Sequence, residues 1–447
     1  MLSDNAGSMR WRAWLVSVAA LLASARAQSA EPSLCEERAC RCDAFTRVIC
    51  NCTAEHDDVM LRPQGVYRVP SMTTGIIVDG CARVHFLTET VRNLRMLREV
   101  YLNNIGSVLI NEKALAWTPF TDLENHQGIN ININNSTITE ISSNAIQGRV
   151  NRITIRNCKV TSLKAFAFSS LIGVTNIELI DNEFEQIEIQ AFKKFTTISF
   201  LLQGGTINFL PSRFLSDVEV TDLFRMDRVN VHHISSVSFL INLPQRVLVE
   251  NNDIGILGGD GFSIVTRGPV TLRNNTILRL EKGGLFGFSV NPAVVSIKGR
   301  QELLFDNNTV NELTPSSFMY NTSTMTMRID GLNLNLTCSC ELAAEWQELQ
   351  KQHGGVVNCW YPLEGYFVSV PTYIDMRCGS FKQTFWIYVV IGIVIVGICA
   401  LLVVWWIVKH ENDKKKKVQM VMPDGKTYRE TEFHIVVERA ELLTTDL

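Results

Sequence analysis

Apolar residues recur along most of the chain in one frame with a period near 24 residues. Counted from a reference position that is often Asn, apolar side chains fall five and three residues before it and two, five and ten residues after it. Around Asn182 these are Ile177, Leu179, Phe184, Ile187 and Phe192. Successive copies, of which those at Cys158, Asn182, Asn252, Asn275 and Asn308 are the clearest, have the reference residues Cys81, Ile105, Ser136, Cys158, Asn182, Gly205, Val229, Asn252, Asn275, Asn308 and Leu332.

This frame predicts a solenoid. The alternating pair before the reference residue is typical of a short strand with one side turned inward. Strands from successive turns would stack into a parallel sheet, and the residue ten positions later, usually Phe or Leu, would fill the core. A buried Asn at the bend can satisfy backbone groups that the bend leaves unpaired. No copy buries its apolar side alone, so both ends of the array need caps.

Two continuous apolar segments indicate a membrane protein. Residues 1–27 resemble a secretory signal, with arginines, an apolar run of 11 residues and small residues at a cleavage site. The run at 386–408 has 23 residues and no charge, which is long enough to cross a bilayer. Trp and Tyr lie at its ends, and Lys409 and the lysines at 414–417 come after it, which predicts a cytoplasmic C-terminus. We therefore expect a single-pass type I protein of the plasma membrane.

The distribution of sequons and cysteines agrees with that topology. Eleven of the twelve cysteines precede the span, on the side where disulfides persist. All N-x-Ser/Thr sequons also precede it, which predicts a glycoprotein. The candidate glycosylation sites are Asn51, Asn134, Asn135, Asn274, Asn307, Asn321 and Asn335.

The repeats and their flanking cysteines resemble the extracellular leucine-rich-repeat family, whose motif is L-x-x-L-x-L-x-x-N/C-x-L. Cys158 fits its N/C position, which indicates a buried structural thiol. Cys35, Cys40, Cys42 and Cys50 before the repeats, and Cys338, Cys340, Cys359 and Cys378 after them, resemble the family's caps. The resemblance implies an α/β horseshoe with a parallel sheet on the concave face. Ile and Val replace Leu widely, and a right-handed parallel β-helix with a similar period is the alternative fold.

The resemblance also implies disulfides and a domain order. Cys338 would pair with Cys359, Cys340 with Cys378, Cys35 with Cys42, and Cys40 with Cys50. Cys52 and Cys81 fall outside the cap pattern and are candidates to pair with each other. The expected order is a signal peptide at 1–27, an N-terminal cap at 28–75, divergent repeats at 76–335, a C-terminal cap at 336–380, a transmembrane helix at 386–408 and a tail at 409–447.

Residues between the apolar strand positions would face outward on the concave side. Glycans at Asn134, Asn274 and Asn307 would crowd this side in their own copies, whereas the middle copies have no sequon. The mixture of Arg, acids and aliphatic residues there suits a protein-binding surface. The candidate ligand face comprises Arg152, Arg156, Glu178, Arg225, Asp227 and Glu250.

Composition and motifs argue against other functions. The 42 basic and 45 acidic residues give a net charge of −3, without the basic surface that a nucleic-acid partner requires. His232 and His233 are adjacent on a predicted strand and point to opposite sides, so they cannot ligate one metal ion together. The chain has no G-x-S-x-G or H-E-x-x-H motif, and Gly258 to Gly261 lacks the Lys-Ser/Thr of a phosphate loop. We therefore expect no enzymatic activity and no cofactor.

The tail carries two short candidate signals. The C-terminal residues Thr445, Asp446 and Leu447 resemble a class I ligand of PDZ domains, which add such a peptide as a strand. Glu438 with Leu442 and Leu443 resembles an acidic dileucine sorting signal for clathrin adaptors.

Together these features predict a cell-surface adhesion protein or co-receptor. Its ectodomain would bind an extracellular protein, homophilic binding included, and its tail would couple to a PDZ scaffold and a clathrin adaptor. A cell-surface β-helix that binds or acts on polysaccharide is the alternative, and a structural organiser of extracellular matrix is a third class.

Overall fold

The computed structural model describes residues 32–44, 46–52, 58–118, 128–378 and 381–416. The predicted signal peptide, the PDZ-type C-terminus and the dileucine signal lie outside these residues. Contacts divide the chain into two units, one ending at Cys378 and the other beginning at Gly379.

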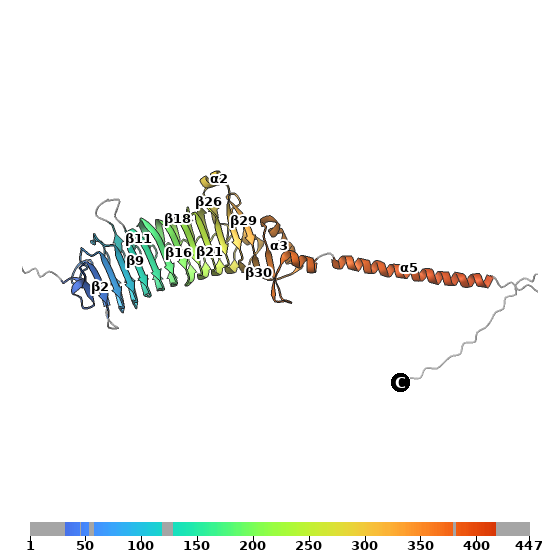
Figure 1. Cartoon of the computed structure of the whole chain (residues 1–447), viewed down its shortest axis with the longest axis horizontal. Helices are drawn as coiled ribbons and strands as arrows, with labels where there is room; N and C mark the ends of the chain where they lie inside the picture. Colours follow the sequence, from blue (N-terminus) through green and yellow to red (C-terminus); the bar gives the residue numbers. More distant parts are fainter. Residues whose placement is uncertain (1–31, 45, 53–57, 119–127, 379–380, 417–447) are drawn as a thin grey trace, which may run out of the picture. The chain divides into compact units, whose positions relative to one another are not determined.

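The first unit is a β-solenoid of about 12 turns whose strands stack side by side in parallel sheets (Figure 1). We call its three sides face A, face B and face C. Face A carries the strands that precede each reference residue. Its separate strands are β2 (Arg47–Asn51), β4 (Gly75–Asp79), β6 (Glu99–Asn103), β9 (Ile129–Asn134), β14 (Val174–Ile180), β21 (Arg246–Glu250), β24 (Val270–Arg273), β27 (Gln301–Asp306) and β29 (Met325–Asp330).

Face B is a separate sheet of 14 strands, most of which come directly after a reference residue. They are β3 (Asp58–Leu61), β5 (Arg83–Phe86), β7 (Ser107–Ile110), β10 (Thr137–Ile141), β12 (Lys159–Leu163), β15 (Glu183–Ile187), β17 (Thr206–Leu210), β19 (Asn230–Ile234), β22 (Asp253–Leu257), β25 (Thr276–Leu280), β28 (Thr309–Glu312), β30 (Leu332–Thr337), β31 (Val357–Tyr361) and β32 (Tyr366–Ser369).

Face C closes the middle turns. Its separate strands are β8 (Leu115–Trp117), β13 (Phe168–Ile172), β20 (Phe239–Asn242), β23 (Phe262–Thr266) and β26 (Phe288–Val290). Three long strands run from face C into face A and pair with neighbours on both: β11 (Ile146–Arg156), β16 (Phe192–Gln203) and β18 (Leu215–Asp227).

The repeat frame sets the register between turns. On face A, Ile177 of β14 lies beside Ile153 of β11 and Phe200 of β16, so equivalent frame positions are neighbours. Because side chains alternate along a strand, this register keeps the apolar residues of every turn on the inner side. The predicted parallel solenoid is therefore confirmed.

After each strand of face A, the path of the chain differs from the α/β arrangement that the family resemblance implied. In the middle turns the chain returns through strands on faces B and C, and the short helix α2 (Pro292–Lys298) is inserted between β26 and β27. A leucine-rich-repeat horseshoe with a concave face is not specifically shown.

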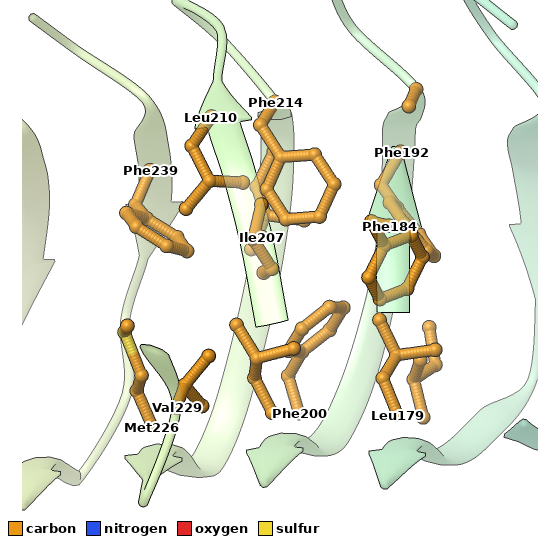
Figure 2. Close-up of a cluster of buried hydrophobic side chains, with 14 of the residues drawn as sticks. Leu179, Phe184, Phe192, Phe200, Ile207, Leu210, Phe214, Met226, Val229 and Phe239 are labelled. Carbon is orange, nitrogen blue, oxygen red and sulfur yellow. The ribbon is translucent and has the colours of Figure 1, made fainter. Parts of the chain in front are cut away.

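Aromatic rings fill the centre of the middle turns. Phe192, ten residues after Asn182, is fully buried and stacks on Phe168 with ring centroids 4.4 Å apart. Phe214 and Phe239 continue this row into the following turns (Figure 2). The row extends through Phe262 to Phe288 with centroids 5.0 and 5.5 Å apart. Burial of each large ring contributes on the order of 2–3 kcal/mol, so the stacked rings are a major source of the cohesion between turns.

Buried asparagines at the reference positions connect turns through their amides. Asn252 donates from Nδ2 to Oδ1 of Asn275 (2.9 Å), and Asn275 donates in the same way to Asn308 (2.9 Å). Each Oδ1 also accepts the backbone N–H of the preceding reference residue. We call this row the asparagine ladder. It satisfies the backbone polar groups of the bend, as the sequence predicted.

Cys158 occupies the ladder position one turn before Asn182. Its thiol is free and buried, and it lies 3.2 Å from the carbonyl oxygen of Arg156. Burial raises the pKa of this thiol to about 11, which keeps it protonated near neutral pH. The prediction of a structural rather than reactive cysteine agrees with this environment.

Disulfides brace the two ends of the solenoid. The N-terminal cap contains η1 (Leu34–Glu36) and β1 (Cys40–Cys42), which pairs antiparallel with β2. Its disulfides are Cys35–Cys42, Cys40–Cys50 and Cys52–Cys81, and those of the C-terminal cap are Cys338–Cys359 and Cys340–Cys378. These are the pairs expected from the sequence.

The C-terminal cap closes the apolar core with a helix. η2 (Pro315–Phe318) precedes the cap, and α3 (Cys340–His353) begins after Ser339, whose hydroxyl accepts the N–H of Leu342. Trp346 on α3 is 1% exposed and packs edge-on against Phe318. β31 and β32 then form an antiparallel hairpin, followed by α4 (Val370–Tyr373) and η3 (Ile374–Cys378).

The second unit contains the helix α5 (Phe381–Lys416). Its segment Phe385–Lys414 is apolar enough and long enough to cross a membrane, and the predicted span at 386–408 lies within it. Lys409 lies over the ring of Trp405, and the ring of Trp406 stacks on His410, so aromatic and cationic residues gather at one end of the apolar run.

Candidate ligand face

The six predicted ligand residues all belong to strands of face A. Arg152 and Arg156 lie on β11, Glu178 on β14, Arg225 and Asp227 on β18, and Glu250 on β21. The strand β16 separates β14 from β18. At about 4.8 Å per strand, the arginines of β11 lie about 14 Å from Arg225. The six residues therefore form two groups and not one cluster.

The first group is an ion-pair network. Arg225 lies 3.5 Å from the carboxylate of Asp227 and 3.3 Å from that of Glu250. Arg228 approaches Asp227 at 3.3 Å, and Asn251 donates from Nδ2 to Asp227 Oδ1 at 2.8 Å. The Asp227 side chain is only 6% exposed. These carboxylates are therefore committed to holding turns together, which leaves them little capacity to bind a ligand.

The second group leaves cationic side chains in solvent. Arg152 and Arg156 are exposed, and no ion pair involves either one within the described residues. Glu178, aligned with Thr154 between them, accepts a long hydrogen bond of 3.4 Å from the threonine hydroxyl. An unpaired guanidinium retains all of its donors for a carboxylate or phosphate from another molecule.

Arg152 also lines a surface depression. Its volume is about 450 Å³, and its wall is polar: Arg98, Glu99, Asn130, Asn132, Asn151 and Arg152. Sequence reasoning missed the contribution of Asn151 and Arg98, which do not occupy outward positions of the repeat frame. The alternating asparagines at 130, 132 and 134 were the one available signal for the polarity of this region.

Partly exposed aliphatic side chains separate the charged groups. Ile180, Leu201, Leu223 and Leu248 project from face A and retain intermediate exposure. Leu201 lies beside Arg225 in the sheet register, and Leu248 lies on its other side. Face A therefore offers apolar contacts over several strands beside the unpaired arginines of β11, which suits an extended partner more than a small molecule.

Most sequons lie beside this region, but Asn134 lies within it, in register with Arg156. Asn135, Asn274 and Asn307 have left-handed backbone conformations at the bend between faces A and B. Asn307 donates from Nδ2 to Oδ1 of Asn274 at 2.8 Å, so these exposed amides form a second row. Asn134 ends β9, Asn335 lies on β30, Asn51 ends β2, and Asn321 precedes β29. The bend places Asn274 and Asn307 at the edge of face A, and the expectation that glycans there would crowd the ligand side stays a prediction.

The histidine pair lies on face B. His232 is exposed on β19, and the ring of His233 lies 5.2 Å from that of Phe209. Among the described residues no group of three or more His, Cys, Asp or Glu side chains could hold a metal ion. No known protein family and no curated protein matches the chain.

Proposed function

We propose that this chain is a single-pass type I cell-surface glycoprotein that binds an extracellular protein through face A, as an adhesion protein or co-receptor. The observation that carries the proposal is the pair of exposed, unpaired arginines on β11, next to partly exposed Ile180 and within turns that contain no sequon. Because arginine is enriched in binding hot spots and its guanidinium pairs with carboxylates, a carboxylate-bearing protein surface is the expected partner.

The fold assignment that accompanies this proposal combines both alternatives. The cysteine caps support a relationship to extracellular leucine-rich-repeat proteins. The strands on three sides of the middle turns support a parallel β-helix. We infer a β-helix-like solenoid closed by caps of the leucine-rich-repeat type.

The tail completes the proposed role. Thr445, Asp446 and Leu447 would add as a strand to a PDZ domain, and Glu438 with Leu442 and Leu443 would engage a clathrin adaptor. The lysines at 414–417 fit a stop-transfer signal on the cytoplasmic side. A surface receptor coupled to a scaffold needs these elements in this order.

Proximity labelling from the ectodomain of the full chain in intact cells tests the proposal. The variant Arg152→Glu/Arg156→Glu changes the charge of face A, and Lys194→Glu/Arg213→Glu applies the same charge change at exposed cations of face C and the adjoining bend. We expect the first variant to lose labelling of a specific surface protein and the second to retain it. Equal labelling by both would refute binding through face A.

A polysaccharide ligand is the second candidate, and the amide-rich strands favour it. Asn130, Asn132 and Asn134 on β9 lie beside Glu99, Tyr101 and Asn103 on β6. Rows of amides spaced by one strand can hydrogen-bond the hydroxyl groups of a chain of sugars. Binding of the ectodomain to a glycan array, lost when Asn130 and Asn132 are replaced by Leu, would favour this alternative over the protein ligand.

A further inference from the structure

The hairpin of the C-terminal cap carries apolar side chains that nothing in the first unit covers. We call residues Pro362–Tyr366, which are the loop between β31 and β32 and the first residue of β32, the hairpin tip. Leu363 is 77% exposed and Tyr366 is 49% exposed. Within the described residues of the first unit, only Ile297 on α2 is a more exposed large apolar residue than Leu363. The tip thus presents two large side chains to solvent within one short segment, which makes it a candidate contact surface.

The structure holds the hairpin tip firmly in this position. Cys359 on β31 is tied to Cys338, and the rings of Trp360 and Phe367 pack edge-to-face across the two strands. Behind the tip, Arg377 donates to the hydroxyl of Tyr361, whose ring packs against that of Tyr373. Because the base is braced from both sides, the tip cannot fold its apolar residues back onto the cap.

The segment that connects the cap to the apolar part of α5 is short. Cys378, tied to Cys340 by a disulfide, is the last residue of the first unit. The apolar segment of α5 begins at Phe385. Seven residues reach at most about 25 Å when fully extended, so Cys378 stays within about that distance of a membrane that α5 crosses. A bilayer is therefore the apolar phase to which this cap is tethered.

The residue types of the tip also fit the bilayer interface. Tyrosine is enriched at the level of the lipid headgroups, and leucine contributes apolar area to a shallow insertion. Glu364 is the one charged residue of the tip. Its carboxylate accepts a hydrogen bond from Tyr366 that raises the pKa of the phenol, so Tyr366 stays neutral. One carboxylate at headgroup level opposes binding to anionic lipid but is compatible with a zwitterionic leaflet.

We propose that the hairpin tip inserts Leu363 and Tyr366 into the headgroup region of the membrane that α5 spans. This docking rests on the proposed function, because it requires that α5 is a membrane span. It gives the ectodomain a second attachment to the bilayer besides the covalent one. The tip thereby fixes which side of the solenoid turns away from the membrane and toward a partner.

Fluorescence quenching in nanodiscs tests the docking on the full chain. The protein is reconstituted in phosphatidylcholine carrying a spin label near the headgroup, and an environment-sensitive dye is attached to one cysteine. Leu363→Cys in a Cys399→Ser background reports on the tip. Ile172→Cys in the same background is the matched control, because Ile172 is 58% exposed but lies far from the cap. Its strand β13 is five strand spacings, about 24 Å, from β26, and the cap lies beyond β26. Cys158 stays unlabelled because it is buried.

A second measurement reports on the span itself. The dye is attached to Cys399 of α5 in the native chain, and the spin label lies deeper in the acyl chains of the lipid. We expect the dye at position 363 to lose at least about half of its emission and the dye at position 172 to stay unquenched. Adding Leu363→Asp to a chain labelled at Tyr366→Cys should abolish quenching there. If Cys399 is quenched but positions 363 and 366 behave like position 172, the docking is refuted and the span stands. If Cys399 escapes quenching, the span and the docking are both refuted.

Discussion

Replacing Asn275 with alanine should destabilise the solenoid far more than its small change in volume suggests. The Asn275 side chain is 1% exposed. Its Oδ1 accepts the backbone N–H of Asn252 at 3.0 Å and the Asn252 amide at 2.9 Å. Its Nδ2 donates to the carbonyl oxygen of Val249 at 2.8 Å and to Asn308 at 2.9 Å. Alanine removes all of these bonds and admits no water to replace them.

The expected loss comes from the groups left behind. The backbone N–H of Asn252 is buried and has Asn275 as its acceptor, and an unsatisfied buried polar group costs about 1–3 kcal/mol. The Val249 carbonyl and the Asn308 amide each lose one partner as well. We therefore expect the free energy of unfolding to fall by about 2–5 kcal/mol.

Urea denaturation of the ectodomain, monitored by far-UV circular dichroism, measures this loss. Asn208→Ala is the matched control, because Asn208 is exposed on β17, and surface substitutions usually change stability by less than about 0.5 kcal/mol. Native-state hydrogen exchange at Asn252 and Thr276 locates the effect. If Asn275→Ala unfolds at the same urea concentration as Asn208→Ala, the ladder contributes nothing and the reasoning fails.

The remaining predictions concern three features: the Cys158 thiol, the Cys52–Cys81 disulfide and the close backbone approach at Gly205. Burial raises the pKa of Cys158 to about 11, so its alkylation at pH 8 should be about 100-fold slower in the native protein than in the unfolded chain; equal rates would contradict the burial. Because folding raises the pKa of this thiol, the free energy of unfolding should be highest below the unfolded pKa of about 9 and should fall as the pH rises toward 11. Urea denaturation across that pH range, with Cys158→Ser as control, measures the fall. Removing the Cys52–Cys81 disulfide by double serine substitution frees a loop of 29 residues and should cost about 3–4 kcal/mol, measured as a lower melting temperature than that of the native protein; an unchanged melting temperature would count against it. Gly205→Ala should abolish display on the cell surface, because the new Cβ would lie 2.0 Å from the carbonyl oxygen of Asn182, whereas Gly173→Ala has open space around its Cβ and should be displayed; surface display of both would contradict the close approach.

The strands of face A were predictable because their inward residues alternate. Ile177 and Leu179 are two residues apart, and both are buried in β14. On face B the inward residues of β15, Phe184 and Ile187, are three residues apart. Two consecutive side chains face outward between them, so the alternation that identifies a strand is broken. On face C, Phe192 and Phe195 of β16 have the same spacing of three. The periodicity therefore located the turns but did not show the strand segments of face C that close the middle ones.

The ligand face was predictable in its location and not in its chemistry. Arg156 and Arg225 both occupy outward positions of the frame on strands of face A. Only Arg225 forms ion pairs with carboxylates, and one of them belongs to Glu250, 25 residues further along the chain. Which arginine is neutralised depends on contacts between turns, and no local pattern in the sequence encodes those. The cap disulfides were predictable because the cysteines resemble the caps of a known family, since spacing alone does not fix the connectivity.

The confinement of the disulfides to the two ends of the solenoid has a consequence for how the molecule could change its reach. Each turn of 23 or 24 residues advances the solenoid by one strand spacing, about 4.8 Å, whereas the same residues in a helix would span about 36 Å. Most residues of a turn therefore run around the solenoid axis, and the distance between the caps grows by whole turns. A gain or loss of one complete turn would move a bound partner closer to or farther from the cell by that fixed step and leave both caps intact. An insertion between strands leaves that distance unchanged: α2 lies between Asn275 and Asn308, which are 33 residues apart and still hydrogen-bonded in the ladder.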